Sequence, residues 1–277
     1  MSKRPAIAVI TVTCNSSEMI DHWLSAIEAS RSVSLSGVVV DCGSDRTEYL
    51  AEVESRLGFK VVKSGNIGFS KANNIGYSLI DSETEYIVFL NPDAFPEPDT
   101  LRRAADILGQ SPDIGCLGGR LLGYDMKKKQ PTGCLDSTGI FRTWYGRWYD
   151  RGQGEEDAGQ YMSPCDVRAV CGAFMFFRRR ALEEAAVDQQ VFDPAFFLYK
   201  EDIELSLRVK KAGWRLVYHP SLRVFHCRGW RRRKKMPQFL KKMSAANEVL
   251  LYRKHPSPYI LWALVKYLAV ITLLRWV

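Results

Sequence analysis

The stretch Ala6-Ile-Ala-Val-Ile-Thr-Val-Thr13 is apolar and β-branched, and it leads directly into the polar residues Cys14-Asn15-Ser16. β-branched side chains favour strands, and no small-residue cleavage site follows, so we predict a buried first strand rather than a signal peptide. Residues 18–30 then have the cap and the apolar spacing of a helix. A strand followed at once by a helix is the first unit of an α/β fold.

The same alternation repeats along the next part of the chain and predicts a mostly parallel, twisted sheet with helices on both faces. Ligands of such sheets bind beyond the carboxyl ends of the strands. Asp41 and Asp93 each directly follow an apolar run, so both are expected at that edge. Further strands are predicted at 38–40, 60–62 and 86–90, and helices at 47–57 and after the glycine-punctuated loop 66–76.

The periodic pattern is lost between Gly123 and Pro164, where Gly, Lys, Trp and Tyr are frequent. A stretch of this length without periodicity is typical of a functional or mobile loop, which is what we expect here. Regular structure is expected to resume with a strand at 167–178. The remaining predicted elements are a helix at 200–212, short strands at 216–218 and 222–226, and a helix at 237–254.

The composition is that of an ordinary globular chain. Of 277 residues, 46% are hydrophobic and 25% are charged, which excludes collagen-like and disordered classes. The seven cysteines include no Cys-x-x-Cys pair, which argues against a disulfide scaffold and a cysteine-based zinc site and favours a reducing cytosol. No Walker-type loop and no G-x-G-x-x-G is present, so neither a P-loop nor a dinucleotide-binding fold is indicated.

The net charge of +8 is concentrated in one segment. Residues 1–222 hold 26 Lys and Arg against 30 Asp and Glu, whereas residues 223–255 hold 11 basic residues and one acid, Glu248. The densest part is Arg228-Gly-Trp-Arg-Arg-Arg-Lys-Lys235. Such a cluster indicates an anionic partner, either a membrane surface or a nucleic acid bound by residues 228–242.

The apolar segment that follows favours the membrane. Residues 259–277 are almost continuously apolar and, as a helix, would be about 28 Å long. Lys266 lies in the middle of this segment, so we expect a helix that lies in the interface or inserts partly rather than a true span. We therefore divide the chain into a catalytic domain, residues 1–226, and a basic, amphipathic helical membrane-association segment, residues 227–277.

Acidic residues stand at strand ends and at one helix start. Asp41, Asp45 and Asp93 follow apolar runs, and the pair Glu201-Asp202 opens a predicted helix. Taken singly, each is also compatible with a turn or a helix cap, and His226 at the end of an apolar run is compatible with simple packing. The residues alone leave metal binding, acid–base chemistry and capping open.

The order of the segments adds a family resemblance. The chain resembles inverting glycosyltransferases of family 2, which have the Rossmann-like GT-A fold, and within them the bacterial rhamnosyltransferase-like branch. The resemblance runs from about residue 6 to residue 255, and the ordered set of motifs is specific. It is carried by Ile10-Thr-Val-Thr-Cys-Asn15, Val40-Asp-Cys-Gly-Ser-Asp45, Gly65-Asn-Ile-Gly-Phe-Ser-Lys-Ala-Asn-Asn-Ile-Gly76, Leu90-Asn-Pro-Asp93, Cys171-Gly-Ala173, Phe196-Phe-Leu-Tyr-Lys-Glu-Asp202, Gly213-Trp214 and Val224-Phe-His226.

The resemblance implies a metal and a base. The family has an Asp-x-Asp motif after its fourth strand, of which Asn91-Pro92-Asp93 keeps only the last residue. Asp93 and His226 are thus expected to bind Mg²⁺ or Mn²⁺ together with the donor diphosphate. Asp202 is expected to be the catalytic base that takes the proton of the acceptor hydroxyl, and Glu201 to orient the acceptor or support the sheet.

The remaining positions fall around the donor and the acceptor. Donor nucleotide contacts are implied for Thr11, Asn15, Asp41, Asn66, Gly68, Lys71 and Asn73, and acceptor contacts or closure of the site for Trp144, Tyr145, Trp148 and Arg151.

The implied function is transfer of a sugar from a nucleotide-sugar donor to a saccharide or lipid-linked acceptor in cell-envelope glycan synthesis. dTDP-rhamnose is the favoured donor, UDP- and GDP-sugars stay open, and the expected place is the cytoplasmic face of the cell membrane. Three alternatives stand beside it. They are a nucleotidyltransferase, for which residues 11–18 lack the expected Arg or Lys, a nucleic-acid-binding protein, and an inactive transferase that acts as a scaffold.

Overall fold

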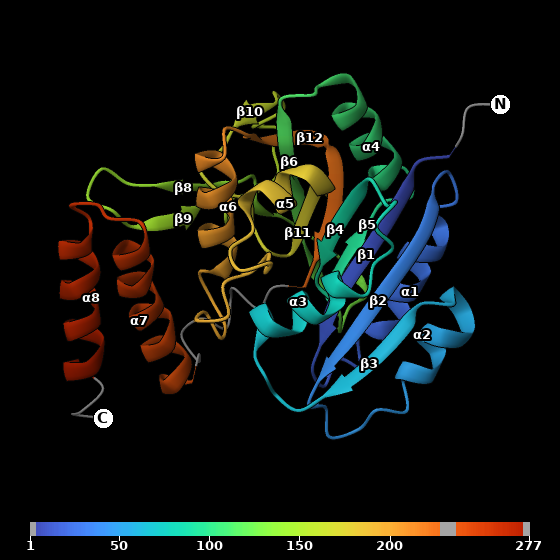
Figure 1. The fold of residues 1–277 in the computed structure, drawn as a ribbon, viewed down its shortest axis with the longest axis horizontal. Helices are drawn as coiled ribbons and strands as arrows, with labels where there is room; N and C mark the ends of the chain where they lie inside the picture. The colour runs from blue at the N-terminus through green and yellow to red at the C-terminus, as the bar shows by residue number, and fades with distance from the viewer. Residues whose placement is uncertain (1–3, 228–236, 274–277) are drawn as a thin grey trace.

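The parallel half of the sheet forms where the apolar runs predict it. In the computed structural model, which describes residues 4–227 and 237–273, β1 (Ala6–Thr13) pairs in parallel with β2 (Ser34–Cys42) and with β4 (Tyr86–Leu90). The edge strand β3 (Lys60–Ser64) pairs in parallel with β2. Figure 1 shows these strands side by side.

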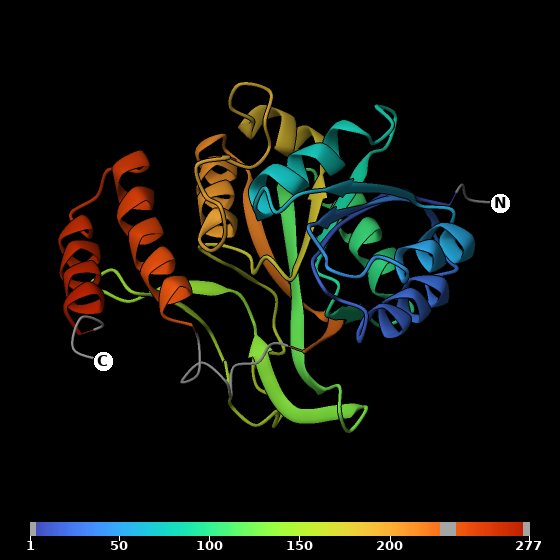
Figure 2. The same ribbon diagram turned by 90° about the horizontal axis from the view of Figure 1, so that it is seen from below.

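Helices cover both faces because alternate residues of β1 face opposite sides. Ile7 and Val9 pack in the same cluster as residues of α1 (Ile20–Ala29) and α2 (Leu50–Leu57). Ile10 faces α3 (Phe69–Ser78), where a Cβ on Gly76 would come within 2.6 Å of the Ile10 side chain. Burying each such aliphatic side chain stabilises the fold by about 1.5–3 kcal/mol. The first strand is therefore a core strand, as predicted (Figure 2).

The other half of the sheet is mixed. The strand order is β10-β12-β6-β11-β4-β1-β2-β3, with β5 on β12 and β7 on β6. The strand β11 runs antiparallel between β4 and β6, whereas β12 and β6 are parallel to each other. The added elements are β5 (Ala94–Pro96), α4 (Thr100–Gln110), β6 (Ile114–Asp125), β7 (Gln130–Ser137), β10 (Cys165–Asp166), β11 (Phe174–Arg178), α5 (Arg179–Ala185), α6 (Glu201–Lys211) and β12 (Arg215–His226).

The expectation of a loop from 123 to 164 is wrong. The segment contains the end of β6, all of β7, and a hairpin of β8 (Ile140–Arg142) and β9 (Trp148–Asp150). β8 and β9 have only three residues each, and the first half of β7 is largely exposed, so their sequences lack the apolar runs by which strands were recognised. Likewise, the strands predicted at 216–218 and 222–226 are one strand, β12, with a shift of register between His219 and Arg223.

Two helices follow the sheet. The helices α7 (Gln238–Lys254) and α8 (Ile260–Leu273) pack on each other and lie beside α6 and the β8–β9 hairpin in Figures 1 and 2. Of the helices in the described ranges, none is both long and apolar enough to cross a membrane. The basic run 228–235 lies outside the described residues, and its role stays a prediction.

Candidate active site at the carboxyl edge of the sheet

Three strands bring the predicted metal ligands and base to one edge. The strands β4, β6 and β12 run in the same direction, because β11 is antiparallel to both β4 and β6 and β12 is parallel to β6. Asp93 follows β4, and His226 is the last residue of β12. The backbone carbonyl of Asp93 accepts the N–H of Cys227 at 2.9 Å, so the two strand ends are in direct contact.

The His226 imidazole lies between two carboxylates. Its Nε2 is 3.3 Å from Asp93 Oδ1, and its Nδ1 is 2.8 Å from Asp136 Oδ2. His226 and Asp136 are buried, whereas Asp93 is 24% exposed, so Asp93 is the member that a ligand reaches first. A carboxylate on the second nitrogen of a metal-binding histidine fixes the orientation of the ring and raises its basicity. Asp136 is a site residue that the sequence analysis did not assign.

The electrostatics of this group favour positive charge. Burial alone would lower the pKa of His226, but the carboxylates of Asp93 and Asp136 raise it to about 9. In the protein alone, therefore, the imidazolium neutralises part of the charge of the two acids. A cation that binds His226 Nε2 has to displace this proton, which makes cation binding pH-dependent.

The donor atoms fit a cation that the protein holds only in part. Asp93 Oδ1 and His226 Nε2 are an oxygen and an imidazole nitrogen at the spacing of two ligands of one ion. In the described part of the chain, no group of three or more His, Cys, Asp and Glu side chains has metal-binding geometry. A cation here needs oxygens from elsewhere, as the loss of the first acid in Asn91-Pro92-Asp93 implies.

The predicted base lies at the amino end of α6. Asp202 accepts the N–H of Gly172 at 3.1 Å through Oδ2 and that of Ile203 at 2.8 Å through Oδ1. Burial raises the pKa of Asp202, and the Lys200 ammonium opposes part of this shift. Burial and the neighbouring Asp202 raise the pKa of Glu201 to about 8. A pair of acids with raised pKa values at a ligand-binding edge is typical of proton-transfer chemistry.

Backbone contacts link Asp202 to the turn that carries Asp93. Gly172, which donates to Asp202, precedes Ala173, whose carbonyl accepts the N–H of Asn91 at 3.1 Å. A Cβ on Gly172 would lie 3.3 Å from the Cβ of Asp202, so a glycine allows α6 to approach this closely. The motif Cys171-Gly-Ala173 therefore places the base beside the Asn91-Pro92-Asp93 turn.

The loop before Asp202 has an unusual conformation. Tyr199 and Lys200 both have positive φ angles, 74° and 75°, which cost free energy for residues other than glycine. The side-chain amide of Asn247 on α7 donates to the carbonyls of Leu198 and Tyr199, both at 2.9 Å. Asn247 thus holds the turn that leads into Asp202, the predicted base, and it is a second residue that no sequence pattern indicated.

The donor-side residues cluster at the ends of β1 and β2. Asp41 is buried and accepts hydrogen bonds from the Ser44 hydroxyl at 2.5 Å and from the Tyr49 hydroxyl at 3.2 Å. Asn15 joins the two loops, since its Nδ2 donates to Asp45 at 3.1 Å and its Oδ1 accepts the Asp45 N–H at 2.9 Å. Thr11 is fully buried within β1, so it is part of the core beneath these loops and has no exposed surface for a nucleotide.

The loop expected at 66–76 is mostly helix, because α3 begins at Phe69; Asn66 and Gly68 precede the helix, whereas Lys71 and Asn73 lie within it. Asn66 and Lys71 are exposed. Gly68 has a φ angle of 87°, and a Cβ there would meet the Phe197 ring at 2.5 Å, so the loop packs against the segment that leads to Asp202. Asn73 is buried and donates to the Phe69 carbonyl at 3.0 Å, which makes it a residue of the helix interior.

The predicted acceptor residues do not lie together. Trp148 is 7% exposed, and Arg151 donates to Thr138 and lies over the Tyr161 ring, so both are engaged in internal packing. Trp144 is 87% exposed at the turn of the β8–β9 hairpin. The neighbouring Tyr145 packs on Trp262 of α8, with ring centroids 4.9 Å apart. Trp144 therefore lies near α8 rather than over the sheet edge.

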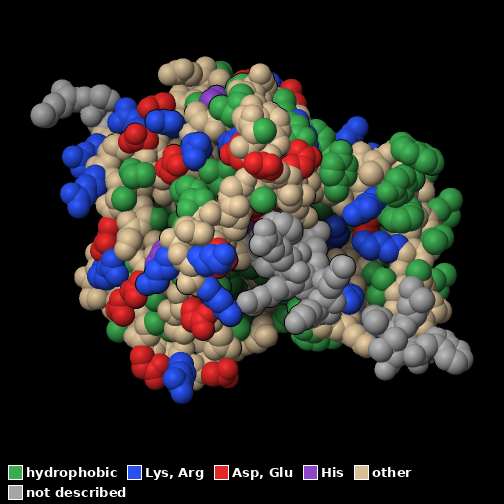
Figure 3. Space-filling view, turned by 180° about the vertical axis from the view of Figure 1, so that it is seen from behind, with side chains coloured by type: hydrophobic (Ala, Val, Ile, Leu, Met, Phe, Trp, Pro, Cys, Tyr) green, Lys and Arg blue, Asp and Glu red, His purple; other side chains and the backbone are tan. Residues whose placement is uncertain are grey.

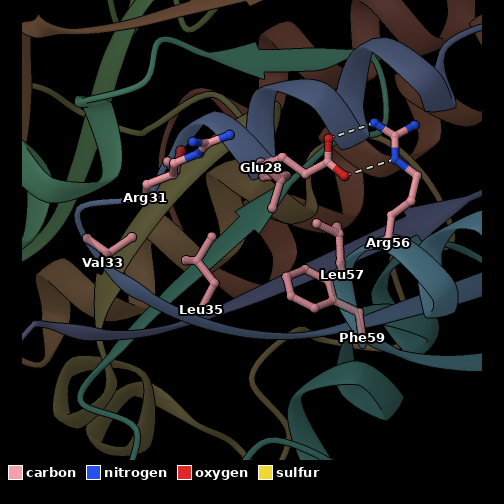
Figure 4. A pocket seen from close by; sticks show the side chains of 9 residues that line it. Glu28, Arg31, Val33, Leu35, Arg56, Leu57 and Phe59 are labelled. Atoms are coloured by element: carbon pink, nitrogen blue, oxygen red, sulfur yellow. Dashed lines mark hydrogen bonds and ion pairs between the residues drawn. The ribbon is translucent and has the colours of Figure 1, made fainter.

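A hollow elsewhere on the surface contains none of these residues. It lies between α1, α2 and the amino ends of β2 and β3, and Figure 4 shows Glu28 in it, paired with Arg56 by hydrogen bonds of 2.9 and 2.7 Å. Because the amino ends of parallel strands lie opposite the edge that carries Asp93 and His226, this hollow is separate from the candidate site.

Solved structures of the same fold define the class. The chain is similar to the mannosyltransferase PcManGT from Pyrobaculum calidifontis in complex with GDP-Man and Mn²⁺, with a TM-score of 0.59 and 19% identity over 98% of this chain and 75% of that chain. It is also similar to GalNAc-T7 with UDP, GalNAc and Mn²⁺, with a TM-score of 0.64 and 15% identity over 98% and 58% of the two chains. The fold is that of the GT-A glycosyltransferases, as predicted.

The sequence narrows this class to one family. The family model described as "Glycosyltransferase like family 2" matches residues 5–245, and the chain belongs to this family of glycosyltransferases. An N-acetylglucosaminyl-diphospho-decaprenol L-rhamnosyltransferase of Mycobacterium tuberculosis is 23% identical over 237 residues, which are 79% of this chain and 75% of that protein. The prediction of a family 2 enzyme of rhamnosyltransferase-like type is confirmed, and the nucleotidyltransferase alternative is dropped.

Proposed function

We propose that the protein is an inverting glycosyltransferase in which Asp202 takes the proton of the acceptor hydroxyl while the sugar leaves a nucleoside diphosphate. The observation that carries this is the contact chain from Asp202 through Gly172-Ala173 to Asn91, which brings the base and the Asp93–His226 pair to one sheet edge. The acceptor oxygen bonds to the anomeric carbon as the bond from that carbon to the diphosphate breaks, so the configuration inverts.

Asp93 and His226 are proposed to hold Mg²⁺ or Mn²⁺ against the donor diphosphate. The bound cation would neutralise charge on the departing diphosphate. Asp136 keeps His226 Nε2 turned toward Asp93. Asp41, Asn15, Asn66 and Lys71 in the first turn of α3 would receive the nucleotide. The Mn²⁺ in the two structural relatives supports this cation role.

The favoured donor is dTDP-rhamnose, and the favoured acceptor is a lipid-linked saccharide used in cell-envelope glycan synthesis. The name of the mycobacterial relative, N-acetylglucosaminyl-diphospho-decaprenol L-rhamnosyltransferase, supports rhamnose as the sugar and a lipid-linked saccharide as the acceptor. Such an acceptor places the enzyme at the cytoplasmic face of the membrane. We retain residues 1–226 as the catalytic part and residues 227–277 as a membrane-association segment. Within that segment, Asn247 of α7 contacts the loop before Asp202.

The variant Asp202→Asn tests the proposal. It keeps the size of the side chain but removes the base, so sugar transfer should fall by about 10²–10⁴-fold. Transfer is measured with dTDP-rhamnose and N-acetylglucosaminyl-diphospho-decaprenol, and binding of dTDP with Mn²⁺ by calorimetry should stay within about twofold. The matched control Asp193→Asn changes an acid at the far end of the same loop and should transfer normally. Full turnover by Asp202→Asn would remove Asp202 from the mechanism.

A further inference from the structure

The outer face of α8 is a stripe of exposed apolar side chains. Leu261, Leu264, Val265 and Leu268 are 68%, 40%, 61% and 55% exposed. They follow the spacing i, i+3, i+4 and i+7, so they lie on one side of the helix. Figure 3 shows hydrophobic side chains gathered along this flank of the molecule. Because α8 already packs on α7 through its other side, an exposed stripe of this kind indicates a second apolar partner on the outer face.

The charge of α8 is directed away from this stripe. Lys266 is the one charged residue in the sequence of α8, and its ammonium pairs with the buried carboxylate of Glu248 on α7. A helix that faces water directs its charged residues outward and its apolar residues inward. The outer face of α8 shows the reverse arrangement, which is the one found where a helix faces lipid.

An exposed tryptophan lies beside the same helix. Trp144 is 87% exposed at the turn of the β8–β9 hairpin, and Tyr145 next to it packs on Trp262 near the amino end of α8. Tryptophan side chains concentrate at the boundary between lipid and water, because the ring is large and apolar and the indole N–H remains hydrated. Two segments far apart in the sequence therefore present apolar surface from one region of the molecule.

We propose that Leu261, Leu264, Val265, Leu268 and Trp144 form a membrane-docking face that lies in the surface of an anionic lipid bilayer. This deepens the proposed function, on which it rests for the lipid-linked acceptor. The proposal specifies which side chains meet the bilayer. One of them, Trp144, belongs to the β8–β9 hairpin and thus lies outside the C-terminal segment 227–277.

Charge decides between a bilayer and a second copy of the chain. Residues 223–255 carry 11 Lys and Arg against one acid. A symmetric dimer through α8 would bring together two copies of α7, which packs on α8 and carries Lys241, Lys242, Arg253 and Lys254 against one acid, Glu248, and their like charges would repel. Anionic headgroups instead attract them, with about 1 kcal/mol for each Lys or Arg near the surface. The bilayer is therefore the occupant that satisfies both the apolar stripe and the charge.

The experiment is vesicle co-sedimentation of the full chain, with vesicles of phosphatidylcholine alone and of phosphatidylcholine mixed with phosphatidylglycerol. The double variant Leu264→Glu/Leu268→Glu should bind the anionic vesicles at least about tenfold more weakly than the unaltered protein. The control Met162→Glu/Val187→Glu adds the same two charges at apolar residues that are 59% and 55% exposed elsewhere, and it should bind normally. Trp144→Ala should weaken binding by a smaller factor.

Two results would overturn the proposal. One is equal vesicle binding by Leu264→Glu/Leu268→Glu and its control. The other is a dimer, seen by sedimentation equilibrium, that this variant dissociates while vesicle binding is unchanged, which would assign the face to a second copy. Binding of dTDP with Mn²⁺ is measured in every variant. Because it does not depend on vesicles, it separates a failure of docking from a failure of the donor site.

Discussion

His226 is useful at this site because its two ring nitrogens have different partners. Asp136 Oδ2 is hydrogen-bonded to Nδ1 at 2.8 Å. Nε2 therefore points at Asp93, on the exposed side of the site. A histidine without this partner could rotate or expose the other nitrogen. The orientation of this proposed cation ligand therefore depends on Asp136, a carboxylate that the cation need not touch.

Replacing that carboxylate tests the dependence. Asp136→Asn should raise the Mn²⁺ concentration for half-maximal sugar transfer by about 10–100-fold, because the amide orients the imidazole less well and lowers its basicity. The measurement is initial rate against Mn²⁺ concentration at saturating donor. The control Asp166→Asn changes an exposed acid that pairs with Arg215 and should leave the curve in place. Identical Mn²⁺ curves for both variants would contradict the role of Asp136.

Glu201 predicts a pH dependence of stability. Its pKa rises from an ordinary value of 4.5 to about 8 on folding, so the folded protein holds this proton more tightly than the unfolded chain does. The resulting stabilisation is present at low pH and is lost as the pH rises from about 4.5 to about 8. Glu201→Gln, which cannot ionise, should therefore have a Tm about 3–8 °C above that of the unaltered protein at pH 9.

At pH 4.5 the same comparison should show almost no difference. The measurement is calorimetric Tm across this pH range, with Glu183→Gln, an exposed acid on α5, as the control. A Tm difference that stays constant with pH would mean that Glu201 is ionised in the folded protein.

Sequence patterns identified some of these residues and not others. Asp93 and His226 were predicted because each ends an apolar run within a family motif. Asp136 was noted only as part of a stretch without periodicity, where a lone Asp before Ser and Thr has the pattern of a turn. Its role comes from burial beside His226, 90 residues away, and no local pattern encodes that.

At the scale of elements, the start of α6 depends on α7. The left-handed Tyr199 and Lys200 cost of order 1–2 kcal/mol each. Hydrogen bonds offset this cost. The Asn247 amide donates to two carbonyls of the turn, and the Phe69 N–H donates to the Phe197 carbonyl at 2.7 Å. The base is held by a turn that its own sequence does not favour.

Removing the amide should therefore affect catalysis more than binding. Asn247→Ala should lower kcat by about tenfold or more, because Asp202 is no longer held in place, and it should leave the KM for the donor within about twofold. The control Lys254→Ala removes another contact of α7 to the same loop, the 2.6 Å pair with Asp193, further from Asp202. Equal kcat values for the two variants would show that Asn247 does not position the base.

The elements themselves were predictable to different degrees. The strands β1 and β4 bury nearly every residue, and β2 buries its second half, so their apolar runs are continuous and easy to recognise. The β8–β9 hairpin has three residues per strand and is held by packing such as that of Trp148 and Arg142. Short strands of this kind are stabilised by tertiary contacts rather than by their own pattern, and the sequence therefore suggested a loop.

At the scale of the whole molecule, the site joins distant parts of the chain. Asp41 and Asp93 follow strands of the parallel half of the sheet, His226 ends β12 in the mixed half, and Asp202 lies in the first turn of α6. A ligand that bridges these parts binds only the folded state, so it should stabilise the whole fold by mass action.

A thermal-shift panel uses this coupling to identify the donor. At a concentration about 100-fold above its Kd, the correct nucleotide sugar stabilises the fold by about 2.7 kcal/mol, which raises Tm by about 5–10 °C. The dTDP-sugar is expected to give the largest shift, and EDTA should remove most of it, because the proposed cation at Asp93 and His226 would link the protein to the donor diphosphate. A shift that EDTA leaves unchanged would contradict a cation between protein and diphosphate.

The contact between Asn247 and the turn before Asp202 also orders events during synthesis. The ribosome makes the whole sheet, including β12, before it makes α7, and domains commonly begin to fold while the chain is still growing. A nascent chain can therefore assemble the sheet while the base is not yet held in place. Full activity would therefore come only after α7 is made, shortly before the helix that we propose to meet the lipid, so activity and membrane attachment would mature in close succession.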